Sequence, residues 1–174
     1  ISQTGGHGDF RMPNEVPEDR VAPLSYMEKT GMTMIADGAD EVLKRVREQL
    51  RNGATQIKLM AGGGVASSYD PLDVTQYTSA EFAAAVSAAE NWGTYVTVHA
   101  YTSAAIQRAI AAGVKCIDHG HLMDEATAKL MAEKGIWLSI QPFLDDEDAT
   151  QFPPGSIQQY KKAQVVSGTD RAYG

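Results

Sequence analysis

Three short apolar segments of this chain each carry a side chain that can bind a metal ion, directly or after modification. The segments are Gln56–Met60, Tyr95–His99 and Lys115–His119, and the candidate ligands are Lys58, His99 and His119. Imidazole nitrogens and carboxylate oxygens suit zinc, which lowers the pKa of a bound water to about 7. The combination therefore indicates hydrolysis by metal-bound water.

The lysine needs a modification before it can act as a ligand. Lys58 lies between Ile57 and Leu59 and has no acidic neighbour in the sequence. Burial in such a segment disfavours the charged ammonium. A neutral amine at the mouth of a barrel can add carbon dioxide and become a carbamate, which is a carboxylate equivalent able to bridge two metal ions. The alternative is a lysine whose head reaches solvent or pairs with an acid from another strand.

The two histidines follow apolar strand residues, and a third histidine lies close by. His119 and His121 flank Gly120, so in an extended chain both side chains point to the same side and can chelate one metal ion. We favour His119 as the ligand because it directly ends its strand. In the alternative interpretation, one of the pair is only a hydrogen-bonding loop residue.

The elements that must position these residues follow one repeated pattern of amphipathic helix, glycine and apolar strand. Glycine just past a helix end supplies the left-handed residue that turns the chain back toward a sheet. The glycines at these junctions are Gly53, Gly93, Gly113 and Gly135. Strands and helices that alternate at this period predict a parallel sheet, and in a (β/α) barrel the C-terminal strand ends build the active site.

Local signals place the helices and further strands. Thr78 and Glu81 form a capping-box motif, and Asp124 is a plausible N-cap for a helix over Glu125–Glu133. An apolar stripe marks the helix before the lysine strand; its residues are Val42, Leu43, Val46 and Leu50.

We expect five strands and about four helices in total. Residues 136–141 form a further strand, and residues 2–6 end an earlier one. Two long loops, at about 9–37 and 145–155, then lie near the barrel mouth, where loops often carry function.

Composition narrows the class of protein. The chain has 174 residues, 43% of them hydrophobic and 21% charged, as in ordinary globular domains. Its formal charge of −7 argues against nucleic-acid binding, and no apolar run approaches the roughly 20 residues that span a membrane. The lone Cys116 excludes an internal disulfide, and its position in a strand predicts a small buried hydrophobe.

Four segments, considered together, form a specific pattern. They are Ser2–Asp9, Ile57–Gly64, Val98–Tyr101 and Ile117–Gly120. With these motifs the chain resembles the amidohydrolase superfamily over essentially its whole length. The branch it resembles holds the binuclear zinc dipeptidases and carboxypeptidases, which are prolidase-like or Xaa-Arg/Lys carboxypeptidase-like.

The resemblance implies roles for particular residues. Lys58 would be carbamylated and bridge two Zn²⁺ ions, while His99 and His119 would bind the second ion. By the same similarity, His7 and Tyr101 would hold the carbonyl or the terminal carboxylate of the substrate.

Two parts of that family's pattern are not matched in this chain. The family carries an HxH pair on its first strand, and on its eighth an aspartate that is both ligand and proton shuttle. Asp170 is a poor match for that aspartate, because the apolar residues from Ile157 to Val166 recur at helical spacing. We therefore place Asp170 on or near the seventh helix and assign no catalytic residue within the chain.

The fold class expected is α/β, a (β/α)8 TIM barrel. A whole barrel takes about 250 residues, so residues 1–174 would form a partial metal-dependent amidohydrolase domain, from about the third strand to the seventh helix. The chain begins at Ile1 without a methionine and ends abruptly after Gly174. We expect both ends to cut through a longer protein and the segment alone to be inactive.

The function expected is hydrolysis of the amide bond of dipeptides or short peptides by a zinc-activated hydroxide, releasing the C-terminal residue. Alternatives are hydrolysis of a cyclic amide or other C–N bond and a non-catalytic barrel that binds a small ligand. A third, a phosphate-binding barrel, is suggested by the run Gly62–Gly64, which fits neither a P-loop nor a dinucleotide fingerprint. We expect a small peptide substrate, no nucleic-acid or membrane partner, and a homo-oligomer.

An acidic segment bears on the choice of substrate. Residues Asp145 to Asp148 follow the predicted strand over 136–141 and would hang over the barrel mouth. A solvated loop is the simplest interpretation. A negative field at a cleft also concentrates cationic substrates, so the segment suggests a preference for dipeptides that end in Arg or Lys.

Overall fold

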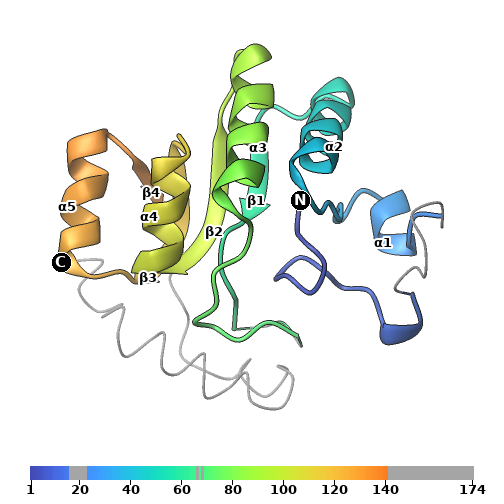
Figure 1. Cartoon of the computed structure of the whole chain (residues 1–174), viewed down its shortest axis with the longest axis horizontal. Coiled ribbons are helices and arrows are strands. Elements are labelled where there is room, and N and C mark those ends of the chain that lie inside the picture. Colours follow the sequence, from blue (N-terminus) through green and yellow to red (C-terminus); the bar gives the residue numbers. More distant parts are fainter. Residues whose placement is uncertain (16–22, 66, 68, 141–174) are drawn as a thin grey trace.

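The computed structural model describes residues 1–15, 23–65, 67 and 69–140. Its centre is a four-stranded parallel sheet in the order β1-β2-β3-β4, so that strands consecutive in the chain are also neighbours in space. One helix precedes each strand, and these helices lie on one face of the sheet (Figure 1). This arrangement is the alternation of helices and parallel strands that the sequence predicts.

The strands bring the candidate ligands to one end of the sheet. Their bounds are β1 Ile57–Met60, β2 Val96–Thr102, β3 Cys116–Leu122 and β4 Trp137–Ser139. In the register, Met60 pairs with His99 and His99 pairs with Asp118. β2 and β3 each continue three residues past the predicted ends, so His99 and His119 lie within strands rather than at their last positions.

The helices begin and end where local signals place them. Their bounds are η1 Pro13–Glu15, α1 Tyr26–Lys29, α2 Ala39–Arg51, α3 Ser79–Asn91, α4 Ser103–Ala111 and α5 Glu125–Lys134. Thr78 and Glu81 form the predicted capping box, and the Asp124 side chain accepts a hydrogen bond from the Thr127 N–H. The four junction glycines have the left-handed backbone they were predicted to supply, with φ of 99°, 79°, 99° and 64°.

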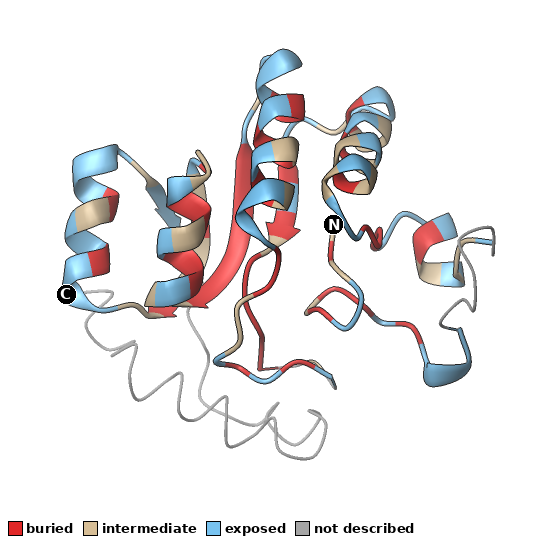
Figure 2. Cartoon of the chain, viewed as in Figure 1, coloured by how far each residue is buried: buried red, intermediate tan, exposed pale blue. Residues whose placement is uncertain are grey.

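The core lies between the helices and the sheet. The α2 stripe of Val42, Val46 and Leu50 is buried, and so are the alternate strand residues Ile57 and Leu59 (Figure 2). Because side chains alternate along a strand, the residues between them, such as Lys58, face away from the helices. That opposite face carries the polar chemistry of the chain.

The first residues of the chain extend the sheet only briefly. The Ile1 amine donates a hydrogen bond to Lys58 O, and Ile1 O accepts one from the Met60 N–H. Ser2 forms a parallel bridge with Ile35. The strand predicted over 2–6 is thus reduced to a bridge, because a turn begins at Thr4. In the part of the chain that the structure describes, no helix is both long and apolar enough for a membrane span.

Candidate metal and substrate site

His99 on β2 and His119 on β3 lie side by side. Their ring centroids are 4.7 Å apart, with the planes at 68°. Burial, together with the neighbouring His7 and His119, lowers the pKa of His99 well below 6.5. Burial and the charge of Lys58 lower the pKa of His119 to about 4. Both rings are therefore neutral at pH 7, which is the form that binds metals.

The hydrogen bonds of these rings show which nitrogens are available. His99 Nε2 lies 2.9 Å from Gly63 O, and since a carbonyl only accepts, Nε2 carries the proton and Nδ1 keeps its lone pair. A metal-binding histidine commonly has its other nitrogen held in this way. Among the described residues, His119 Nδ1 is buried without a hydrogen-bond partner. The sheet thus presents two neutral imidazoles suited to a metal ion.

The chain is not extended at His119, which corrects the expectation for the HxH pair. His119 has φ 77° and Gly120 has φ 66°, both in the left-handed region. The pairing of β2 with β3 shifts between Ala100 and Thr102, so that β3 holds one extra residue. This bulge turns the backbone, and the rings of His119 and His121 end 6.1 Å apart and tilted by 38°.

Lys58 on β1 pairs with an acid two strands away. Its Nζ lies 2.8 Å from Asp118 Oδ2, and its side chain is 43% exposed. The expectation of a buried, unpaired lysine is therefore wrong for this structure, because the helices cover the other face of the sheet. The alternative, pairing with an acid from another strand, is the arrangement found. Lys58 is still near enough to lower the pKa of both His99 and His119.

His7 comes from the N-terminal loop and stacks on His99. The ring centroids are 4.0 Å apart and the planes 15° from parallel. Its Nδ1 lies 3.0 Å from Ser67 Oγ and 3.4 Å from Asp70 Oδ2, and its backbone N–H donates to Gln76 Oε1 at 2.9 Å. A residue that the sequence separates widely from the strand histidines is thus part of the same cluster.

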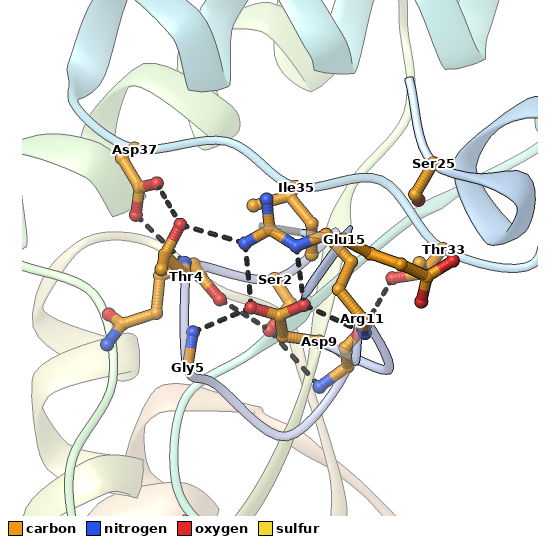
Figure 3. A network of polar contacts seen from close by, with 12 residues as sticks. Ser2, Thr4, Gly5, Asp9, Arg11, Glu15, Ser25, Thr33, Ile35 and Asp37 are labelled. Atoms are coloured by element: carbon orange, nitrogen blue, oxygen red, sulfur yellow. Dashed lines mark hydrogen bonds and ion pairs between the residues drawn. The ribbon is translucent and has the colours of Figure 1, made fainter. Parts of the chain in front are cut away.

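A buried ion pair fixes the loop that carries His7. Arg11 binds Asp9 in a bidentate manner, with Nε to Oδ1 and Nη2 to Oδ2 both at 2.7 Å (Figure 3). Asp9 Oδ2 also accepts from the Gly5 N–H at 2.8 Å. Thr4 Oγ1 accepts from Arg11 Nη2 and donates to Asp37 Oδ2 (Figure 3). These contacts close the turn from Gly5 to Asp9 around His7.

Tyr101 completes the cluster. Its ring is buried and lies 5.1 Å from that of His99 and 5.3 Å from that of His119, nearly parallel to the latter. It also lies 5.5 Å from the ring of His121. The structure therefore brings together the predicted substrate residues, His7 and Tyr101, and the two predicted histidine ligands.

The glycine run after β1, Gly62–Gly64, leaves space for the ring of His7. A Cβ on Gly64 would lie 1.8 Å from His7 Cε1, so only glycine allows the ring to approach. The N–H groups of Gly63 and Gly64 already donate to Val74 O and Asp70 Oδ2. Because these donors are occupied within the chain, the run is not arranged as a phosphate-binding loop.

The donor set fits a metal ion but does not complete its site. Within the described residues no three His, Cys, Asp or Glu side chains are grouped so that they could hold a metal, and zinc takes four ligands. A carbamate on Lys58 would add oxygen donors to the two imidazoles. His99 and His119 alone would therefore supply two of the four ligands that zinc takes, and further donors would be needed.

Sequence reasoning missed the acids near this site and one short helix, α1. Asp118 lies in the predicted strand that ends at His119, but the residue it pairs with, Lys58, is on β1. Asp70 and Ser67 lie in the loop after the lysine strand, at the sheet edge where functional loops gather. The short helix α1 has a complete capping box of Ser25 and Glu28, a signal present in the sequence.

The free cysteine differs from its prediction. Cys116, expected to be buried, is partly exposed, with Sγ 4.0 Å from Asp118 Oδ1.

Comparison with known proteins identifies the family. Residues 7–163 match the profile of the amidohydrolase family. The chain belongs to the amidohydrolase family. It is 40% identical over 140 residues to ochratoxinase from Aspergillus niger, in a match that covers 78% of this chain and 29% of that protein.

Two solved structures are similar in both sequence and shape. A prolidase complexed with N-methylphosphonate-L-proline is 44% identical with a TM-score of 0.82, covering 99% of this chain and 42% of that one. A Xaa-Pro dipeptidase with methionine bound in its active site is 30% identical with a TM-score of 0.71, covering 97% and 41%. The chain thus spans less than half the length of these relatives.

The comparisons confirm two predictions from the sequence. The chain is a portion of an amidohydrolase barrel, and its neighbours belong to the prolidase-like branch. The predicted acidic segment 145–148 and Asp170 lie outside the described residues.

Proposed function

We propose that the protein containing this chain is a metal-dependent hydrolase that cleaves the amide bond of dipeptides or short peptides and releases the C-terminal residue. The observation that carries this proposal is the cluster of His7, His99, Tyr101 and His119 over one end of a parallel sheet. The similarity to a prolidase and a Xaa-Pro dipeptidase supports the choice of bond.

The residues for a metal centre follow from the donor set. His99 and His119 would supply neutral imidazoles, and a carbamylated Lys58 would bridge two Zn²⁺ ions. Zinc in such a site makes hydroxide available near pH 7 and polarises a carbonyl. For Lys58 to serve, it must leave Asp118, so the ion pair at 2.8 Å is the arrangement of the unmodified amine.

The substrate would bind beside the imidazoles. The His7 ring stacks on that of His99, and the Tyr101 ring contacts both strand histidines, so both rings lie beside the proposed metal ligands. A phenol hydroxyl and a ring N–H are suitable donors to a carbonyl or a terminal carboxylate. This placement supports the substrate-holding roles of His7 and Tyr101.

A second candidate is hydrolysis of an amide that is not a peptide. The 40% identity to ochratoxinase favours it, and it needs the same metal and histidine residues. The two candidates differ only in the group that binds beyond the scissile bond.

The test is the hydrolysis of a dipeptide series by the intact protein, with zinc and after removal of metal by a chelator. The proposal expects turnover that the chelator abolishes and zinc restores. Turnover of only non-peptide amides would select the second candidate, and metal-independent turnover would contradict the metal centre.

The same dipeptide series also tests whether the acidic segment 145–148 influences the choice of substrate. We propose that substrates ending in Arg or Lys have a higher kcat/KM than those ending in Pro or Leu, because carboxylates pair with guanidinium and ammonium groups. Replacing Asp145 and Asp146 by Asn should then reduce the preference. Equal kcat/KM values for Arg- and Leu-terminated dipeptides would leave the segment without a role in selection.

A further inference from the structure

A buried carboxylate supports the ring of His7 from a different loop. The Asp70 side chain is only 1% exposed, and its Oδ2 lies 3.4 Å from His7 Nδ1. The same oxygen accepts from the Gly64 N–H at 3.0 Å and from Gln76 Nε2 at 3.2 Å. Burying a carboxylate is costly unless it is hydrogen-bonded. Here both residues that donate hydrogen bonds to Asp70, Gly64 and Gln76, also lie against His7.

The neighbours of Asp70 hold His7 at several points. Gln76, which donates to Asp70, accepts from the His7 backbone N–H at 2.9 Å. Gly64, which also donates to Asp70, leaves the space that the imidazole occupies. Ser67 Oγ reaches Nδ1 at 3.0 Å. The ring is thus enclosed by residues that Asp70 ties together.

A carboxylate beside one ring nitrogen determines which nitrogen carries a proton. An ionised carboxylate only accepts hydrogen bonds, so its approach favours a proton on Nδ1. With Nδ1 directed to Asp70 and Ser67, Nε2 is the nitrogen that remains for a ligand. Asp70 Oδ1 is buried and, within the described part of the chain, has no hydrogen-bond partner, so Oδ2 makes all the contacts of this group.

We propose that Asp70 is a positioning residue for substrate binding: it keeps the proton of His7 on Nδ1 and holds the ring so that Nε2 faces the substrate. This inference rests on the proposed function, in which His7 contacts the substrate. It assigns Asp70 no contact with the substrate itself.

The experiment compares Asp70→Asn with the wild type in the intact protein. An Asn side chain has the same shape but loses the charge and can present an amide donor to Nδ1. We expect the ¹⁵N resonances of His7 to show an Nδ1 proton in the wild type and a shift toward the other tautomer in the variant. The matched control is Asp73→Asn, at an exposed carboxylate in the same loop.

Kinetics provide a second readout. We expect Asp70→Asn to lower kcat/KM by about 10- to 100-fold, by analogy with the range for residues that orient a metal-binding histidine. Combined with His7→Ala, it should cause no further loss, because both changes remove the same interaction. If Asp70→Asn does not fold, Asp70→Ser takes its place with the same expectations.

The two readouts separate this inference from the proposed function. If no dipeptide is hydrolysed, the proposed function fails, while the His7 resonances still decide the role of Asp70. Unchanged His7 resonances in the Asp70 variant, or losses that add fully to those of His7→Ala, would overturn the inference.

Discussion

His7 and His99 stack face to face, with ring centroids 4.0 Å apart and planes 15° from parallel. One ring belongs to the N-terminal loop and the other to β2, so the stack joins the proposed substrate-binding loop to the proposed metal centre. Displacing either ring would therefore change the packing of the other.

The stack depends on the glycine beside it. In Gly64→Ala the new Cβ would lie 1.8 Å from His7 Cε1, so the ring must move away from His99. Displacements of about 1 Å near reacting groups can cost about 100-fold in rate, and we expect a fall of that order in kcat/KM. Gly53→Ala is the control, because no atom lies within 4 Å of its Cβ position; it should lower stability and leave kcat/KM unchanged. Full activity in Gly64→Ala would show that the position of His7 is not important.

The ion pair that closes the His7 loop should contribute to stability. Asp9→Asn removes the charge from a carboxylate that accepts three hydrogen bonds from Arg11 and one from Gly5. Hydrogen bonds to charged groups contribute about 1.5–3 kcal/mol, and we expect the free energy of unfolding in urea to fall by about that amount. Glu125→Gln, which breaks the exposed pair with Lys129, should change it by about 0.5 kcal/mol or less. Equal effects of the two variants would contradict a structural role for the buried pair.

The same pair predicts how stability depends on pH. Burial alone would raise the pKa of Asp9, but its hydrogen bonds with Arg11 and Gly5 hold that pKa below 3.8. A carboxyl whose folded-state pKa is depressed contributes stability above its unfolded pKa of about 3.9 and loses it as the pH falls through the folded value. Unfolding curves of the wild type and Asp9→Asn should therefore differ near neutral pH and converge in acid below about pH 4. A difference that stays constant with pH would contradict this assignment.

The sequence predicts the framework of this site well. Parallel strands between helices end at one edge of a sheet, so the placement of His99 and His119 follows from strand order alone. The left-handed glycines and the capping box of Thr78 are local signals, and local signals are readable without the fold. The family resemblance rests on other local motifs, the segments Ser2–Asp9, Ile57–Gly64, Val98–Tyr101 and Ile117–Gly120.

The remaining features depend on contacts between distant residues. The pair of Lys58 and Asp118 spans the strand between them, and Asp70 reaches His7 from a loop that is far from it along the sequence. Neither pairing leaves a signal in local spacing. The left-handed backbone at His119 arises from a bulge in the pairing of β2 with β3. Such a register shift is set by the neighbouring strand and not by the residue itself.

Anomalous diffraction at the zinc edge from crystals of the intact protein would locate the metal centre directly. We expect zinc bound to imidazole nitrogens of His99 and His119 at about 2.0–2.1 Å. We also expect additional density on Lys58 Nζ, with the contact to Asp118 lost. Zinc bound elsewhere, or Lys58 still unmodified and paired with Asp118 in zinc-loaded, active crystals, would contradict the proposed metal centre.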